Sequence, residues 1–154
     1  MIADIDIELA RLADAHAIAH LSREAIEYGL RWSWTETRVT RAIRNRSTNV
    51  IVARDGAVLS GFAIMVYRND EAHLHLLGVA ARWRRHGIGS ALMAWLEVTV
   101  VTAGIGRIRV ETRATNTVAR EFYVRHGFKE TSLWRGYYQG LDDAVQMTKT
   151  LWAT

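Results

Sequence analysis

The segment from residue 76 to residue 90 constrains the fold more than any other, because a short apolar run there leads into a basic, glycine-containing turn. The run Leu76–Val79 is typical of a buried strand, and the turn at residues 84–89 reads RRHGIG. From residue 88 to residue 98 the apolar side chains recur at helical spacing. Glycine lets a ligand approach the backbone closely, and the N-terminal end of a helix attracts anions. The segment therefore predicts a cradle for a pyrophosphate group, with the two arginines of the turn adding positive charge.

Length and composition favour one ordinary globular domain. A chain of 154 residues can bury a substantial core, so residues 1–154 are expected to form a single domain. No apolar run reaches the roughly 18 residues that a membrane span requires. The acidic start of the chain (Asp4, Asp6, Glu8) is unlike a secretory signal. We therefore expect a soluble cytoplasmic protein without a membrane partner, and nothing in the sequence specifies its oligomeric state.

The chain contains no cysteine. This absence excludes disulfide bonds, cysteine metal sites and a thiol nucleophile. The histidines outside residues 73–75 have no acidic or cysteine partner at ligand spacing, so no metal site is expected. Arginine supplies nearly all of the formal charge of +4. An anionic cofactor explains the arginines of the turn at least as well as nucleic acid does, and no helix-turn-helix or zinc pattern is present, so nucleic acid is not an expected partner.

Hydrophobic periodicity and turn residues divide the chain into eleven elements. Strands are expected near residues 5–9, 49–53, 61–67, 73–79, 107–112, 128–133 and 144–151, and helices near 14–29, 35–46, 88–103 and 116–127. Asp14 is expected to cap the first helix and Gly127 to end the last one. A polar and aromatic loop containing Tyr137, Tyr138, Asp142 and Asp143 is expected between the last two strands. The order βααβββαβαββ predicts one α/β (α+β) domain.

The turn at residues 84–89 resembles the acyl-CoA pyrophosphate loop of the GNAT superfamily of N-acetyltransferases. In that loop a basic or amide residue stands three positions before the first of two glycines, as Arg84, Gly87 and Gly89 do here. The superfamily's next motif is matched by Asn116, Ala119, Phe122-Tyr123 and Gly127-Phe128. The resemblance implies a single-domain GNAT fold, with a mixed central sheet of about seven strands flanked by about four helices, and acetyl-CoA as the cofactor.

Residues 60–151 resemble one group within the superfamily, the N-alpha-acetyltransferases that act on the N-terminal alanine of a ribosomal protein. The matching residues are Val110–Asn116, Tyr123, Gly127-Phe128, Arg135–Tyr138, Asp143-Ala144 and Met147. By this match Glu111 corresponds to the general base and Tyr123 to the general acid. The walls of the acceptor groove would be Trp32, Trp34, Tyr137 and Tyr138.

The same resemblance implies a set of contacts with acetyl-CoA. The backbone of Leu77, Gly78 and Val79 would pair with the pantetheine arm. The pyrophosphate would be held beside Arg84 by the amides of Arg85, His86, Gly87, Ile88, Gly89 and Ser90. Asn116 would hydrogen-bond the cofactor, and Ala119 is expected to contact it.

The residues themselves allow direct attack of an amine on the acetyl group, since no cysteine can form an acyl-enzyme. An α-amino group has a pKa of about 8, so a carboxylate acting through a water can deprotonate it. Glu111 is the candidate base. It could equally be an ion-paired carboxylate beside Arg109 or Arg113, and His75 is an alternative base. Tyr123, with an ordinary pKa of about 10, can protonate a leaving thiolate or simply pack in the core.

We therefore expect an acetyl-CoA-dependent N-acetyltransferase that acts on a primary amine in a ternary complex, with a protein N-terminal α-amino group as the first candidate. Two alternatives stay open. One is an N-acetyltransferase of small-molecule amines such as polyamines, amino acids or antibiotics, which would share the fold and the cofactor. The other is a non-catalytic acyl-CoA-binding module.

Overall fold

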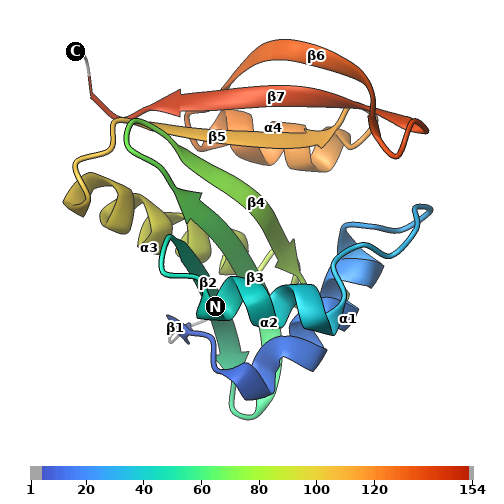
Figure 1. The fold of residues 1–154 in the computed structure, drawn as a ribbon, viewed down its shortest axis with the longest axis vertical. Coiled ribbons are helices and arrows are strands. Elements are labelled where there is room, and N and C mark those ends of the chain that lie inside the picture. Colours follow the sequence, from blue (N-terminus) through green and yellow to red (C-terminus); the bar gives the residue numbers. More distant parts are fainter. Residues whose placement is uncertain (1–4, 153–154) are drawn as a thin grey trace.

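The computed structural model describes residues 5–152. Seven strands form one mixed sheet in the order β1-β2-β3-β4-β5-β7-β6 (Figure 1). The strands are β1 (Asp6–Leu9), β2 (Thr48–Asp55), β3 (Val58–Tyr67), β4 (Ala72–Val79), β5 (Arg107–Arg113), β6 (Lys129–Tyr138) and β7 (Asp142–Thr150). The helices are α1 (Ala15–Ala25), α2 (Glu36–Arg44), α3 (Ile88–Thr102) and α4 (Thr117–Arg125). The predicted fold and order of elements are confirmed.

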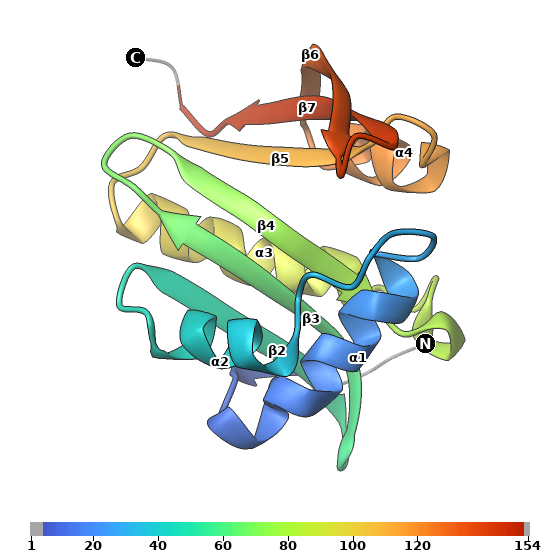
Figure 2. The same cartoon turned by 45° about the vertical axis from the view of Figure 1, so that its right-hand side comes forward.

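Helices cover both faces of the sheet (Figures 1 and 2). Helices α1 and α2 pack on one face against Val50, Val52 and neighbouring residues of β3 and β4. Helices α3 and α4 pack on the other face, where Ile51 and Ala53 point. Because β2 is buried on both faces, its apolar residues form a continuous run instead of an alternating pattern. None of the helices within residues 5–152 is long and apolar enough to cross a membrane.

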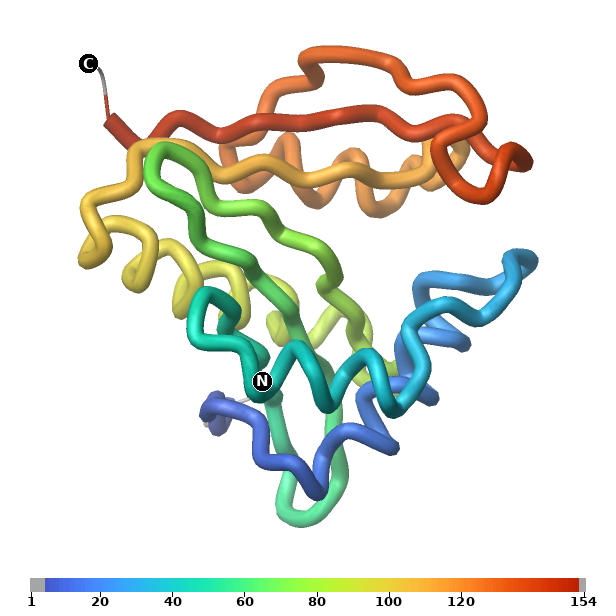
Figure 3. The backbone as a smooth tube through the Cα atoms, in the orientation of Figure 1, coloured from blue at the N-terminus to red at the C-terminus, as the bar shows by residue number. Residues whose placement is uncertain are grey.

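The two central strands part halfway along their length. Parallel pairing between β4 and β5 runs only from Ala72↔Ile108 to Leu74↔Val110. The register between β3 and β4 shifts at the same level, where His75 is the extra residue of a β-bulge. Beyond this point β4 and β5 diverge, as the backbone in Figure 3 shows. The backbone of residues 76–79 is therefore paired with β3 on one side and open on the other.

Two local predictions were wrong. Asp14 does not cap α1 with its side chain, because its carboxylate accepts a hydrogen bond from the backbone N–H of Arg11 (2.8 Å) and pairs with Arg54 (2.6 Å). Tyr137 and Tyr138 belong to β6, and Asp142 and Asp143 to β7, so the intervening turn comprises only residues 139–141. The first helix also ends earlier than expected, at Ala25. Gly127 does end α4, with a φ of +89°.

Candidate active site

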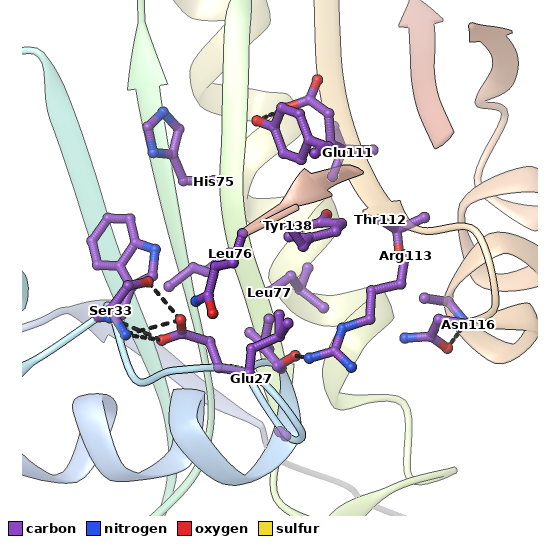
Figure 4. A pocket seen from close by; sticks show the side chains of 18 of the residues that line it. Glu27, Ser33, His75, Leu76, Leu77, Glu111, Thr112, Arg113, Asn116 and Tyr138 are labelled. Carbon is purple, nitrogen blue, oxygen red and sulfur yellow. Dashed lines mark hydrogen bonds between the residues drawn. The ribbon is translucent and has the colours of Figure 1, made fainter. Parts of the chain in front are cut away.

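A pocket of about 440 Å³ opens where β4 and β5 diverge. Its walls come from β4, β5, the start of α4, the end of β6 and the segment that follows α1 (Figure 4). The structure brings the following residues of the expected site together in its lining: Trp34, His75, Leu77, Glu111, Asn116, Ala119, Tyr123, Tyr137 and Tyr138. The strand divergence thus creates the space, and side chains far apart in sequence surround it.

Glu111 is a buried carboxylate at the pocket, with 8% of its side chain exposed. Its Oε1 atom accepts hydrogen bonds from His73 Nε2 (2.5 Å) and from the hydroxyl of Tyr137 (3.4 Å). Arg109 Nε lies 3.2 Å from Oε2 and forms an ion pair with it but no hydrogen bond. Burial raises the pKa of Glu111, but the hydrogen bond from His73 and the positive charge of Arg109 outweigh it, so the net pKa lies below its ordinary value. Glu111 is thus both the ion-paired carboxylate and a pocket residue.

His75 lies beside this carboxylate as a half-buried ring. Its ring centroid is 4.4 Å from that of His73 and 6.0 Å from that of Trp34. Burial lowers the pKa of His75 to about 4, and the neighbouring His73 and Arg38 contribute to the decrease. The ring is therefore neutral near pH 7, and its low pKa makes it a weak proton acceptor.

Tyr123 projects from α4 into the pocket and is 6% exposed. Its ring packs edge-on against Phe122 and Phe128, each at 5.3 Å between centroids. Burial raises the pKa of its phenol above the ordinary value. Within residues 5–152 its hydroxyl has no hydrogen-bond partner, although it is not sealed off from solvent. The side chain therefore packs like a core tyrosine while its polar end is free to meet a ligand.

The turn before α3 forms a surface loop with its amides unpaired. Arg85 and Gly87 have left-handed backbones, with φ of +64° and +82°. The backbone N–H groups of residues 85–90 find no acceptor in the described part of the chain, and the first to bond is that of Ala91, to the carbonyl of Gly87 (3.0 Å). Such a row of free donors at the start of a 15-residue helix fits a diphosphate.

The two glycines of this turn are required for different reasons. A Cβ at Gly87 would meet nothing within 4 Å, and the positive φ of this residue is what favours glycine there. A Cβ at Gly89 would lie 3.0 Å from the ring of Phe122, so glycine lets α3 approach α4. Ser90 strengthens this junction, because its hydroxyl is 2.9 Å from His126 Nε2 while His126 Nδ1 is 2.7 Å from the carbonyl of Phe122.

Other expected site residues lie around the pocket rather than in its lining. Gly78, Val79 and the turn at residues 84–90 are outside it, on the open edge of β4 and at the start of α3. Trp32 is not brought to the pocket, since its indole N–H donates to the carbonyl of Ala19 (3.2 Å). Asn116 caps α4 by accepting the N–H of Ala119 (3.0 Å), which leaves its side-chain NH₂ group to donate.

Three pocket residues are not among the expected site residues, although Arg113 belongs to the matched segment Val110–Asn116. Glu27 is 7% exposed and accepts hydrogen bonds from the N–H and hydroxyl of Ser33 and the N–H of Trp34 (Figure 4). Arg113 donates to the carbonyl of Ile26 (3.0 Å) and thereby ties the segment after α1 to β5. Gln139 lines the pocket from the β6–β7 turn. Each shapes the pocket through contacts that only the tertiary structure creates.

Comparison with known proteins shows the family of the chain. The profile of the Acetyltransferase (GNAT) family matches residues 12–128. The ribosomal protein bS18-alanine N-acetyltransferase of Escherichia coli K12 is 29% identical over 137 residues, which cover 87% of this chain and 89% of the relative. The enzyme of that name from Salmonella typhimurium is 32% identical over 117 residues, or 74% of this chain and 78% of the relative.

A solved structure is similar over nearly the whole chain. The crystal structure of the ribosomal-protein-S18-alanine N-acetyltransferase from Escherichia coli superposes with a TM-score of 0.84 at 25% identity, over 98% of this chain and 96% of that one. The family profile, the two named relatives and this solved structure all indicate the family that the glycine turn of the sequence resembles. The chain therefore belongs to the GNAT family of acetyltransferases, whose acetyl donor is acetyl-CoA.

Proposed function

We propose that this protein acetylates the N-terminal α-amino group of a protein, with Glu111 as the proton acceptor and Tyr123 as the hydrogen-bond donor to the leaving sulfur. The observation that carries the proposal is that one pocket holds a buried ionised carboxylate and a phenol without a hydrogen-bond partner among residues 5–152. It lies beside the turn before α3, whose amides are likewise unpaired within those residues. The bS18-alanine N-acetyltransferases named above support the choice of acceptor. On this proposal residues 1–154 form one acetyltransferase domain.

The binding role falls to backbone groups. The free N–H groups of residues 85–90 and the positive end of α3 would hold the diphosphate of acetyl-CoA. The open edge of residues 77–79 would pair with the amides of its pantetheine arm, and the side-chain NH₂ of Asn116 would donate to the cofactor. Once bound, acetyl-CoA supplies an acetyl thioester.

Two protons are then involved in the reaction, the one that the amine loses and the one on the phenol of Tyr123. The acceptor nitrogen forms a bond to the acetyl carbon as the carbon–sulfur bond breaks. Glu111 takes the proton that the amine loses, directly or through a water. The phenol of Tyr123, whose pKa is raised by burial, keeps its proton at neutral pH and can donate it as a hydrogen bond to the sulfur as negative charge develops there.

The electrostatics of Glu111 favour an α-amine over a lysine side chain. A carboxylate whose pKa is lowered is a weak base, so it suits an ammonium that loses its proton easily. The pKa of an α-amino group is about 8 and that of lysine about 10.4, which makes deprotonation of lysine about 3 kcal/mol more costly. Trp34, Tyr137 and Tyr138 also wall the pocket, so the acceptor must enter between rigid rings.

The proposal is tested by thiol release from acetyl-CoA against a panel of amines. The panel holds peptides beginning with Ala, Ser or Met, the same peptides with a blocked N-terminus and an internal lysine, a polyamine, an aminoglycoside and free amino acids. Turnover confined to free peptide N-termini is the expected result. Turnover confined to small amines would overturn the acceptor, and acetyl-CoA binding without any turnover would favour a non-catalytic acyl-CoA-binding protein.

A further inference from the structure

His73 and Glu111 are brought together by the short parallel ladder between β4 and β5. Pairing of His73 with Arg109 in that ladder places Glu111 two residues further along the same strand, on the same face as Arg109. The side chains of His73 and Glu111 are only 15% and 8% exposed, and His73 Nε2 lies 2.5 Å from Glu111 Oε1. The contact is thus short and largely removed from water.

The second nitrogen of the imidazole defines which atom carries the ring proton. His73 Nδ1 lies 3.1 Å from a terminal guanidinium nitrogen of Arg109. Arginine can only donate hydrogen bonds, so Nδ1 accepts, and a neutral ring in this contact carries its proton on Nε2. The Nε2–H group then donates to Glu111. Because both ring nitrogens are engaged, the ring cannot rotate without losing both bonds.

Arg109 is itself held in place from the outer end of the sheet. Its other terminal nitrogen lies 3.3 Å from Glu71, and Glu71 also pairs with Arg107 at 3.1 Å. A continuous series of polar contacts thus runs from Glu71 through Arg109 and His73 to Glu111. It holds the imidazole of His73 between Arg109 and the pocket carboxylate of Glu111.

We propose that His73 is a positioning residue for acetyl transfer, which holds the carboxylate of Glu111 in one orientation at the pocket and in its ionised form. The proposal rests on the proposed function, in which Glu111 accepts the proton of the amine. Besides His73, the groups that face Glu111 are His75 from β4, Arg109 from β5, Tyr137 from β6 and Gln146 from β7. Of these only Arg109 is a fixed positive charge, and it is shared with Glu71.

Loss of the imidazole leaves the buried carboxylate of Glu111 with fewer hydrogen-bond donors, so its pKa rises. As the pH is lowered, the variant's carboxylate is therefore protonated, and lost as a base, at a higher pH than that of the wild type. The test measures kcat/KM for an alanine-initiated peptide from pH 4.5 to pH 9 with wild type, His73→Ala, His73→Leu and His73→Gln. Dividing each variant's value by that of the wild type at the same pH cancels the ionisation of the peptide. A Glu111 pKa that rises above its ordinary value makes this ratio several-fold smaller at pH 4.5 than at pH 8, where the carboxylate is ionised in both proteins.

His73→Leu fills the volume of the ring and tests the same loss if the alanine variant does not fold. His73→Gln retains an N–H donor and is expected to restore a ratio that depends little on pH. The matched control is His16→Leu, because His16 also contacts a glutamate (Glu36, 3.1 Å) but on α1, with 69% of its side chain exposed. Its ratio is expected to stay near one at every pH.

A pH-independent ratio for both His73→Ala and His73→Leu overturns the inference. Full activity of Glu111→Gln would instead overturn the proposed base, so the two failures are distinguishable. A second readout needs no turnover: the ¹⁵N shifts of the His73 ring are expected to show the proton on Nε2. A proton on Nδ1 would contradict the assigned contact with Arg109.

Discussion

The side-chain amide of Gln139 makes two hydrogen bonds with the backbone of Arg31. The N–H of Arg31 donates to Gln139 Oε1 (2.8 Å), and Gln139 Nε2 donates to the carbonyl of Arg31 (2.7 Å). The pair links the segment after α1 to the β6–β7 turn, which lie on the same side of the molecule in Figure 3. Since Gln139 lines the pocket, this link sets how far apart two of its walls stand.

Removal of this link is expected to weaken acceptor binding. In Gln139→Ala the two walls lose both hydrogen bonds, and we expect the KM for the peptide to rise about threefold to tenfold, equivalent to about 1 kcal/mol. The KM for acetyl-CoA is expected to stay constant, because the turn before α3 is separate. Steady-state kinetics with each substrate varied in turn would measure both. The control is Leu141→Ala, in the same turn but 70% exposed, and an equal effect there would contradict the assignment.

Replacement of Tyr123 by phenylalanine separates a chemical role from a packing role. The hydroxyl has no partner among the described residues, so Tyr123→Phe is expected to change the free energy of unfolding by less than about 0.5 kcal/mol. We expect kcat to fall about tenfold to a hundredfold, because the leaving sulfur loses its donor. Denaturant titration and kcat, determined on the same preparation, give the two values. A stable variant with unchanged kcat would show that the ring serves packing alone.

Gly87 should matter for the cofactor through its backbone conformation. An alanine at φ +82° is strained by about 1 kcal/mol, and relief of that strain moves the amides of the turn. Gly87→Ala is therefore expected to raise the Kd for coenzyme A about fivefold, as calorimetry would show. Gly56→Ala is the matched control, since Gly56 also has a positive φ (+62°) and open space but lies in the β2–β3 turn. The control should lose similar stability and keep its Kd.

Gly89 should matter through packing instead. The added methyl group of Gly89→Ala would lie 3.0 Å from Phe122 and force α3 and α4 apart. Overpacking of this kind typically destabilises a protein by about 1–3 kcal/mol. We expect the double change Gly89→Ala with Phe122→Leu to recover part of that loss, measured by urea unfolding. A single variant as stable as the wild type would show that the helices are not in close contact.

The fold was predictable where local patterns carry it. Alternating and helical periodicities, together with the turns marked by Gly127 and by the glycines of residues 84–89, predict the order of the seven strands and four α-helices. The predicted cap at Asp14 is wrong because Arg54, from a distant strand, pairs with its carboxylate. The sequence predicts a loop at residues 137–138 because their strand, β6, is the exposed edge of the sheet and shows no alternation of buried and exposed residues.

The site was predictable only in part. The glycine turn and the residues of the recognised motifs are local in sequence, and the divergence of β4 and β5 places several of them at one pocket. The contact of His73 with Glu111 depends on the register of two parallel strands joined through α3, which periodicity does not specify. The same holds for Glu27 and Gln139, whose partners are backbone groups of a segment without regular structure.

The central claim is that Glu111 promotes transfer of acetyl to a peptide N-terminus. The most direct measurement uses one peptide that carries a free N-terminal alanine and one internal lysine, with fragmentation mass spectrometry to locate the acetyl group. The account predicts acetyl on the α-amine alone, and with Glu111→Gln a rate lower by about a hundredfold at unchanged acetyl-CoA affinity. Acetyl on the lysine, or an undiminished rate for the variant, would contradict it.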